Sequence, residues 1–231
     1  GKSFLTADFA ARVTTGSPWP DGAVTPKGSV VFLTAEDDPS VLATRIEACR
    51  GTLSMVYVIS SMRDAEGKEV SPLLTEANIA MMMDSFRKFQ DLRLVVIDPI
   101  GSYLPSRVDA FRDNEIRGCL APLARLASEL NFSILLVAHR RKNDVGSAGA
   151  DAGVLGSVAF TASARAVLHV GCDPEDSSKR ILASGKSNFS LPQPALRFFI
   201  GGDPPAVYWD GEVDISADQL VQESSARQIS A

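Results

Sequence analysis

Three apolar runs of this sequence each end in a side chain that can bind a metal ion or move a proton. Glu36 ends "SVVFLTAE", Asp98 follows "LRLVVI" and His139 ends "FSILLVAH". A carboxylate can hold Mg²⁺ or deprotonate a water, and an imidazole can donate or accept a hydrogen bond near neutral pH. If the runs are parallel strands, their carboxyl ends lie at one edge of a sheet, and the three side chains converge there.

The chain opens with Gly1, Lys2 and Ser3, and the same residue types recur at 185–187. Gly-Lys-Ser ends the phosphate-binding loop G-x-x-x-x-G-K-[ST], which must lead directly into a helix whose free amides face the phosphates. Apolar residues at helical spacing follow the first copy, and a Gly-Ser-Pro stop follows them. The second copy is followed by two prolines, and Arg180 stands where the first loop glycine should be. We therefore interpret only the first copy as a phosphate loop, whose strand and earlier glycines are expected upstream.

The residue types suggest a division of roles around a triphosphate. Taken alone, Asp98 is explained by a strand cap before a proline turn, but together with Ser3 it supplies the two protein contacts that a Mg²⁺ ion needs there. Asp38 is expected to cap the helix that begins at Pro39. Glu36 is then available to orient and deprotonate a water in line with a γ-phosphate.

Four further cationic or imidazole side chains have two interpretations each. A lone histidine is more often structural than catalytic, yet His139 could sense a γ-phosphate by a hydrogen bond, whereas His169 inside "AVLHVG" is interpreted as structural. Arg165 and Lys186 could each reach the nucleotide of a neighbouring subunit, or could be solvated surface charges.

The elements that must position these residues follow from the apolar pattern. Apolar strands alternate with helix-like segments, which predicts a parallel sheet buried on both faces. Strands are expected at 29–36, 55–60, 92–100 and 132–139, with helices at 40–50, 74–90 and 112–130. From Arg165 onward, four strand-like runs separated by turn residues predict antiparallel hairpins that extend the sheet.

Composition narrows the class of protein. The chain has 231 residues, of which 45% are hydrophobic and 22% charged, as expected of one globular domain. A net charge of −5 argues against coating nucleic acid by bulk charge, but a local basic stripe or an oligomeric channel could still bind a strand. The widely spaced Cys49, Cys119 and Cys172 indicate neither a disulfide framework nor a zinc site, so we expect a reducing, cytoplasmic setting. No signal peptide is visible, and no apolar run reaches the ~18 residues of a membrane span, so no membrane partner is expected.

The stretch after the third strand is the candidate nucleic-acid contact. It runs from 140 to 156, is rich in glycine and alanine, and begins with Arg140, Arg141 and Lys142. A long aperiodic segment that leaves the carboxyl end of a strand borders the ligand crevice of an α/β sheet.

Five segments, in this order and spacing, resemble the RecA-like ATPases of the plasmid RepA hexameric helicase group, relatives of the DnaB and KaiC proteins. They are "GKSFLTADFAARV", "VVFLTAEDDP", "LVVIDPIGSYL", "LLVAHRRK" and "LGSVAFTASARAVLHV". The resemblance covers Gly1 to about Asn188. It implies an α/β fold of the RecA-like three-layer sandwich type, with a mostly parallel sheet extended by C-terminal antiparallel strands.

The resemblance also implies residue roles. In the Walker A loop, Gly1, Lys2, Ser3 and Phe4 would bind ATP, with Lys2 on the β- and γ-phosphates and Ser3 on Mg²⁺. Glu36 matches the catalytic glutamate and Asp98 the Walker B aspartate.

The remaining matches concern the sensor strand, the DNA and the neighbouring subunit. His139 matches the end of the sensor strand, where the group tends to carry two histidines and this chain has Ala138. The 140–156 segment matches the loop that touches single-stranded DNA. Arg165 matches the arginine finger, and Lys186 the lysine of a Lys-x-Arg element whose arginine is replaced by Asn188.

The expected protein is therefore a Mg²⁺-dependent, helicase-type replication ATPase of a plasmid, phage or mobile element. Its expected partners are further copies in a hexameric ring, single-stranded DNA and replication proteins. The alternatives are a KaiC-like ATP-binding regulatory or assembly module and an inactive remnant that binds ATP poorly without the upstream strand. The ATPase domain is expected at 1–212, followed by a polar tail at 213–231 that is either a short helix or frayed.

Overall fold

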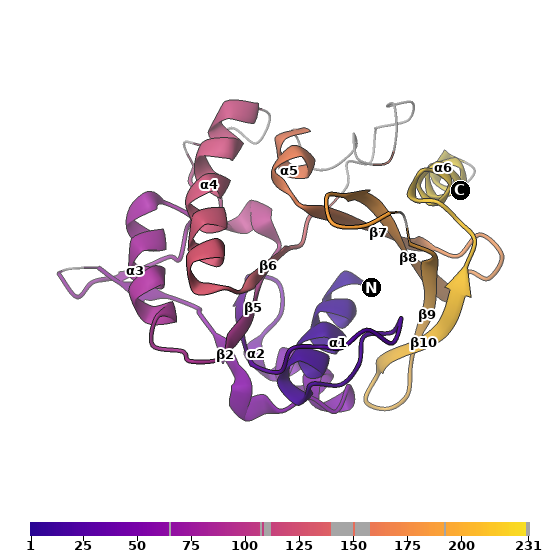
Figure 1. The fold of residues 1–231 in the computed structure, drawn as a ribbon, viewed down its shortest axis with the longest axis horizontal. Helices are drawn as coiled ribbons and strands as arrows, with labels where there is room; N and C mark the ends of the chain where they lie inside the picture. Colours follow the sequence, from indigo (N-terminus) through magenta and orange to yellow (C-terminus); the bar gives the residue numbers. More distant parts are fainter. Residues whose placement is uncertain are drawn as a thin grey trace.

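The computed structural model describes residues 1–64, 66–106, 108, 112–139, 150, 158–191 and 193–229. Its helices are α1 (Lys2–Thr15), α2 (Pro39–Ala48), α3 (Glu76–Phe86), α4 (Asp113–Leu130), α5 (Val158–Ser163) and α6 (Ala217–Ile229), with short 3₁₀ turns η1 (Leu53–Met55) and η2 (Ile100–Tyr103). These helices surround two four-stranded sheets, as Figure 1 shows.

The first sheet is parallel and holds the strands predicted from the apolar runs. Its strands are, in spatial order, β2 (Val56–Val58), β1 (Ser29–Thr34), β5 (Leu92–Asp98) and β6 (Ser133–Leu136). Each neighbouring pair runs in the same direction. The carboxyl ends of β1, β5 and β6 therefore meet at one edge.

Helices cover both faces of the parallel sheet, which explains why its strands are apolar at every position. Val30 and Phe32 pack with α1 and α2, whereas Val31 and Leu33, which point the other way, pack with α3 and α4. Figure 1 shows α3 and α4 on one side of β5 and α1 on the other. The three-layer α/β architecture expected from the sequence is confirmed.

The second sheet is antiparallel and forms from the C-terminal part of the chain. Its strands are β7 (Ala166–Cys172), β8 (Lys179–Ser187), β9 (Ala195–Gly201) and β10 (Ala206–Val213), in the spatial order β10-β9-β8-β7. The antiparallel strands expected after Arg165 are therefore present. Within the described residues they pair with one another and make a sheet of their own.

Helix α1 lies between the two sheets. Ala7 and Ala10 pack against the parallel sheet, and Leu5 packs with Phe198 and Val207 of the antiparallel sheet. The helix ends at Gly16, whose φ of 77° is a left-handed conformation that favours glycine. The predicted helix after the first Gly-Lys-Ser is thus confirmed, and its first residues face the same edge as the strand ends.

Two smaller elements complete the fold. The hairpin of β3 (Met62–Arg63) and β4 (Glu69–Val70) precedes α3 and was not expected from the sequence. Helix α6 buries Ala217 and Leu220 against Ile181 of β8, so the helical alternative for the C-terminal segment is the one found.

Cysteines and membrane-spanning character agree with the sequence. Cys49, Cys119 and Cys172 are all free. In the described part of the chain, no helix has both the length and the apolar character that a bilayer span needs.

Candidate nucleotide site

Strand register brings the predicted acidic residues to one edge. Thr34 at the end of β1 lies opposite Asp98 at the end of β5, and Ile97 lies opposite Leu136 at the end of β6. The backbone of Ala35 also donates a hydrogen bond to the carbonyl of Asp98, over 3.1 Å. The chain therefore enters the segments that carry Glu36 and His139 at the same edge as Asp98.

His139 lies between Lys2 and Glu36. The Nζ atom of Lys2 is 3.4 Å from Nδ1 of His139, and Nε2 of His139 is 3.4 Å from Oε1 of Glu36. The side chains of His139 and Glu36 are 51% and 52% exposed, so this row of polar groups is open to a ligand. Residues that are 137 positions apart in the sequence thus share one hydrogen-bonding row.

Asp98 is the buried carboxylate of the site. It is only 5% exposed and accepts a hydrogen bond from the side chain of Ser3. Burial raises the pKa of Asp98, and the negative charges of Glu36 and Asp37 raise it further, whereas Ser3 and the positive charge of Lys2 lower it. Because this carboxylate is desolvated, a cation bound beside it would be strongly favoured.

A second aromatic and ionic layer supports the turn after β1. Arg45 of α2 makes an ion pair of 2.5 Å with Asp37, and its guanidinium lies 4.5 Å from the centre of the Phe4 ring. The backbone amide of Asp37 donates to the hydroxyl of Thr34, over 3.3 Å. Arg45 therefore ties the turn before α2 to the first turn of α1.

The helix-capping prediction for Asp38 is confirmed. Its carboxylate accepts hydrogen bonds from the amide of Ser40 at 2.8 Å and from the hydroxyl of Ser40 at 2.6 Å, and Pro39 is the first helical residue. These bonds lower the pKa of Asp38. Since Asp38 is occupied by the cap, Glu36 is the acidic side chain of this turn that faces His139.

The donor atoms fit a magnesium ion rather than a transition metal. Ser3 and Asp98 present a hydroxyl and a carboxylate that already contact each other, and hard oxygen donors are what Mg²⁺ prefers. Over the described ranges, no group of three or more His, Cys, Asp or Glu could hold a metal by itself. Such a sparse donor set suits an ion that takes one or two protein ligands and completes its shell with phosphates and waters.

A tyrosine and an arginine of the site were missed by sequence reasoning. Burial and the charge of Asp98 raise the pKa of Tyr103 to about 12, which places this tyrosine near the buried carboxylate. Arg45 was overlooked because a single arginine in an amphipathic helix carries no signal of its partner. The eight-residue separation of Asp37 and Arg45, about two helical turns, was the available hint.

The other predicted residues lie away from this cluster or beyond the described residues. Arg165 is exposed just before β7, and Lys186 lies in β8 with its ammonium at the end of α5. The second Gly-Lys-Ser lies within β8, which confirms that it is not a phosphate loop. His169 is buried in β7. The predicted nucleic-acid contacts at 140–142 are outside the residues that the structure describes.

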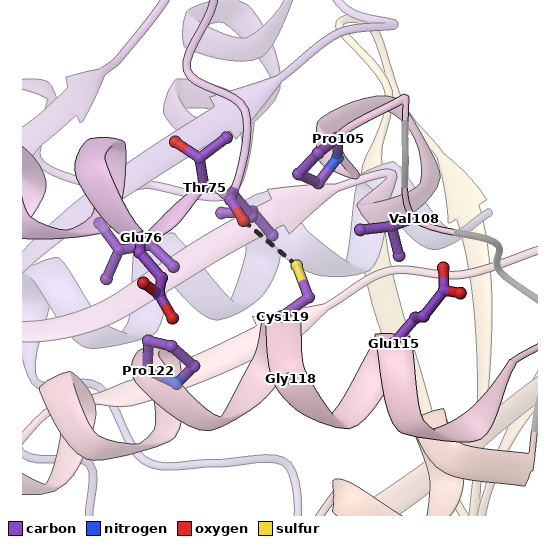
Figure 2. A pocket seen from close by; sticks show the side chains of 10 residues that line it. Thr75, Glu76, Pro105, Val108, Glu115, Gly118, Cys119 and Pro122 are labelled. Carbon is purple, nitrogen blue, oxygen red and sulfur yellow. Dashed lines mark hydrogen bonds between the residues drawn. The ribbon is translucent and has the colours of Figure 1, made fainter.

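An apolar cavity of about 410 Å³ lies at a different place, between α3, α4 and the loop after η2 (Figure 2). Leu74, Ile79 and Cys119 line it, and the thiol of Cys119 contacts the carbonyl of Leu74 at 3.3 Å. None of the residues gathered at the strand ends borders this cavity. The candidate site is therefore an open edge of the sheet rather than an enclosed pocket.

Fold and site together define a RecA-like P-loop ATPase: strand ends with Glu36 and Asp98 face a helix that begins at a Gly-Lys-Ser sequence. The chain belongs to the AAA domain family, which matches residues 1–145. No curated protein sequence matches the chain significantly.

Solved structures agree on the fold. The RadB recombinase superposes with a TM-score of 0.54 at 15% identity, covering 87% of this chain and 82% of that one. The ATPase domain of a second protein gives 0.58 at 12% identity, covering 86% and 76%. A DnaB-like replicative helicase, described with its primase interactions, gives 0.61 at 10% identity, covering 87% of this chain and 54% of the helicase.

Proposed function

We propose that this chain is a Mg²⁺-dependent ATPase of the plasmid RepA helicase group that acts on single-stranded DNA during replication of a plasmid, phage or mobile element. The observation that carries the proposal is the convergence of Lys2, Ser3, Glu36, Asp98 and His139 at one sheet edge. A triphosphate needs cationic and amide donors, a metal ligand pair and a base for water, and these residues supply that set.

The residues at the start of α1 bind the phosphates in this proposal. Lys2 donates its ammonium hydrogens to phosphate oxygens, and the free amides of the first turn add the positive end of the helix dipole. Ser3 and Asp98 hold Mg²⁺, whose contribution when bound is to neutralise the phosphate charge. The hydrogen bond between Ser3 and Asp98 already aligns their oxygens.

Glu36 and His139 act on the water and on the phosphate end. Glu36 is half exposed and orients a water while accepting its proton. His139 bridges Lys2 and Glu36, so it can report the presence of a phosphate at Lys2 to the residue that handles the water. This gives the imidazole a positioning part between the two.

The remaining parts of the proposal concern the assembly. Further copies form a ring, expected to be a hexamer, in which Arg165 or Lys186 reaches the nucleotide of the neighbouring copy. Arg140, Arg141 and Lys142 bind the DNA backbone, and replication proteins are further partners. The likeness to a DnaB-like replicative helicase that interacts with primase supports this setting.

The test is ATP turnover with and without single-stranded DNA. We expect turnover that requires Mg²⁺ and rises when single-stranded DNA is added, because a motor couples hydrolysis to the strand. Turnover that DNA leaves unchanged would instead indicate a KaiC-like assembly module, and no turnover at all would contradict the ATPase proposal.

A variant isolates the DNA contact. Arg141→Ala with Lys142→Ala should weaken single-strand binding and reduce the slope of log affinity against log salt, by about 0.7 for each phosphate that is no longer neutralised. The matched control is Arg63→Ala with Lys68→Ala, which removes the same charges from the β3–β4 hairpin. An unchanged salt slope in the 141/142 variant would remove this segment from the DNA-binding surface.

A further inference from the structure

The turn between β8 and β9 exposes two large apolar side chains. Phe189 is 76% exposed and Leu191 is 83% exposed, and they are separated by a single serine. A pair of apolar side chains held in water at one point of a surface marks a contact site. Aromatic and aliphatic anchors of this kind supply most of the binding energy in protein interfaces.

The turn that carries them is held by its own hydrogen bonds. The hydroxyl of Ser187 accepts from the amides of Phe189 and Ser190, both at 3.2 Å. The side-chain amide of Gln193 donates to the carbonyl of Leu191 at 3.0 Å. Because the turn is already ordered, little conformational entropy is lost when its apolar side chains are buried against a partner.

The same turn is fastened to the backbone of Arg165. The amide of Asn188 donates to the carbonyl of Arg165 at 2.8 Å. The ammonium of Lys186 donates to the carbonyls of Thr161, Ala162 and Ala164 at 3.0 to 3.1 Å. Lys186 therefore caps the end of α5, as a cation at a helix C-terminus does, while the exposed charge beside the turn is that of Arg165.

The candidate nucleotide site is acidic and complements this surface. Glu36, Asp37 and Asp98 are its carboxylates, whereas its cations among the described residues are Lys2 and Arg45. Arg45 is held by Asp37 at 2.5 Å. A basic group brought by another molecule would therefore find an acidic rim at the sheet edge.

We infer that the turn 187–191 docks on a second copy of this chain and thereby positions Arg165 toward the nucleotide site of that copy. The role of Arg165 rests on the proposed function, whereas the docking of the turn can be measured without it. The structure divides the two candidate cations between two tasks. Lys186 fixes the turn and α5 as one body, and Arg165 is the group that this body presents.

Sedimentation velocity of the full chain with ATP and Mg²⁺ tests the docking surface. We expect the unmodified chain to assemble as its concentration rises, and the Phe189→Ser, Leu191→Ser double variant to sediment as a monomer over the same range. Val24→Ser is the matched control, because Val24 is 88% exposed and lies in the loop after α1. A double variant that assembles like the unmodified chain, or an unmodified chain that never assembles, would overturn the inference.

Mixing two inactive variants tests the positioning of Arg165. Glu36→Gln keeps the arginine and loses the base, and Arg165→Ala does the reverse. In an equal mixture, about one quarter of interfaces join an intact arginine to an intact site, so turnover should recover to about that share of the unmodified rate. Adding the Phe189→Ser and Leu191→Ser changes to the Glu36→Gln partner should abolish the recovery.

Two results of the mixing experiment have opposite meanings for the two proposals. No recovery in the mixture would overturn the part given to Arg165, even if the turn mediates assembly. If the unmodified chain has no turnover, the proposed function fails, and sedimentation alone decides whether the turn docks.

Discussion

The two ring nitrogens of His139 face groups of opposite charge. Nδ1 lies 3.4 Å from the ammonium of Lys2 and Nε2 lies 3.4 Å from the carboxylate of Glu36. A neutral imidazole can accept at one nitrogen and donate at the other, which suits this arrangement and fixes its tautomer. Glu36 therefore has a defined orientation although half of its side chain is in water.

Replacing Glu36 by glutamine tests its role as a base. Glu36→Gln keeps the size of the side chain and removes its ability to accept a proton, so turnover should fall about 10²- to 10⁴-fold. ATP binding, measured with a fluorescent ATP analogue, should change little. Glu47→Gln, an exposed glutamate of α2, is the control and should keep full turnover. A Glu36→Gln variant with turnover near that of the unmodified chain would show that another group activates the water.

Asp98→Asn should stabilise the chain when Mg²⁺ is absent. Burial raises the pKa of Asp98 above its ordinary value of 3.8, so the folded state binds its proton more tightly than the unfolded state does. Stability from this group is therefore complete in acid and declines as pH rises from 3.8 through the raised pKa. The neutral asparagine avoids this loss, so the urea midpoint of the variant should exceed that of the unmodified chain at neutral pH.

Added Mg²⁺ and ATP should reverse that order. They stabilise the unmodified chain by mass action, whereas the variant lacks the carboxylate that binds the ion. Ser190→Ala, a change in the β8–β9 turn, is the control and should respond to Mg²⁺ and ATP like the unmodified chain. Equal stabilisation of the Asp98→Asn variant would mean that Asp98 does not hold the metal.

Sequence reasoning found the residues whose position follows from strand ends alone. Glu36, Asp98 and His139 each follow an apolar run, and parallel pairing then brings them to one edge. It missed Arg45 and Tyr103, because their contacts depend on how α2 and the η2 turn pack against other elements. Such contacts leave no periodic pattern in the sequence.

At the level of elements, α1 is the part that joins the candidate site to the rest of the fold. Its first turn carries Lys2 and Ser3, and further along Asp8 accepts hydrogen bonds from Nε1 of Trp209 at 3.1 Å and from Nε of Arg12 at 2.8 Å. Asp8 is only 5% exposed. The bond from Trp209 in β10 thus ties the helix to the antiparallel sheet through a buried carboxylate.

Trp209→Phe should therefore destabilise the chain more than Trp19→Phe does. Both changes remove similar apolar area from a half-buried tryptophan, but only the first leaves Asp8 without one of its donors. Loss of a hydrogen bond to a buried charged group costs about 1.5 to 3 kcal/mol. Urea unfolding of the two variants measures the difference. Equal losses would mean that the bond to Asp8 contributes nothing net.

Elements with a clear period were predicted, and those fixed by pairing were not. The four parallel strands and the helices between them follow from apolar runs and helical spacing. The β3–β4 hairpin has only two residues in each strand, too short for an alternating pattern to be recognised. That the antiparallel strands hydrogen-bond as a separate sheet depends on long-range pairing, which local patterns do not encode.

In the whole molecule, one helix connects two hydrophobic clusters. Phe9 of α1 packs against both the cluster of the parallel sheet and the cluster that contains Phe198 of the antiparallel sheet. Each sheet covers one side of α1, so neither can separate from the helix without exposing apolar surface that the helix now buries. The two sheets should therefore unfold together, although within the described residues no strand ladder joins them.

The two tryptophans make this cooperativity measurable, because Trp19 packs in the cluster of the parallel sheet and Trp209 in that of the antiparallel sheet. In Trp209→Phe the fluorescence reports only Trp19, and in Trp19→Phe only Trp209. We expect the fluorescence transition of each variant in urea to coincide with its own circular dichroism transition, as in two-state unfolding. Phe9→Ala, added to either variant, should lower both midpoints together. A Trp209 transition at lower urea than the loss of helix would show that the antiparallel sheet detaches first and that α1 does not couple the halves.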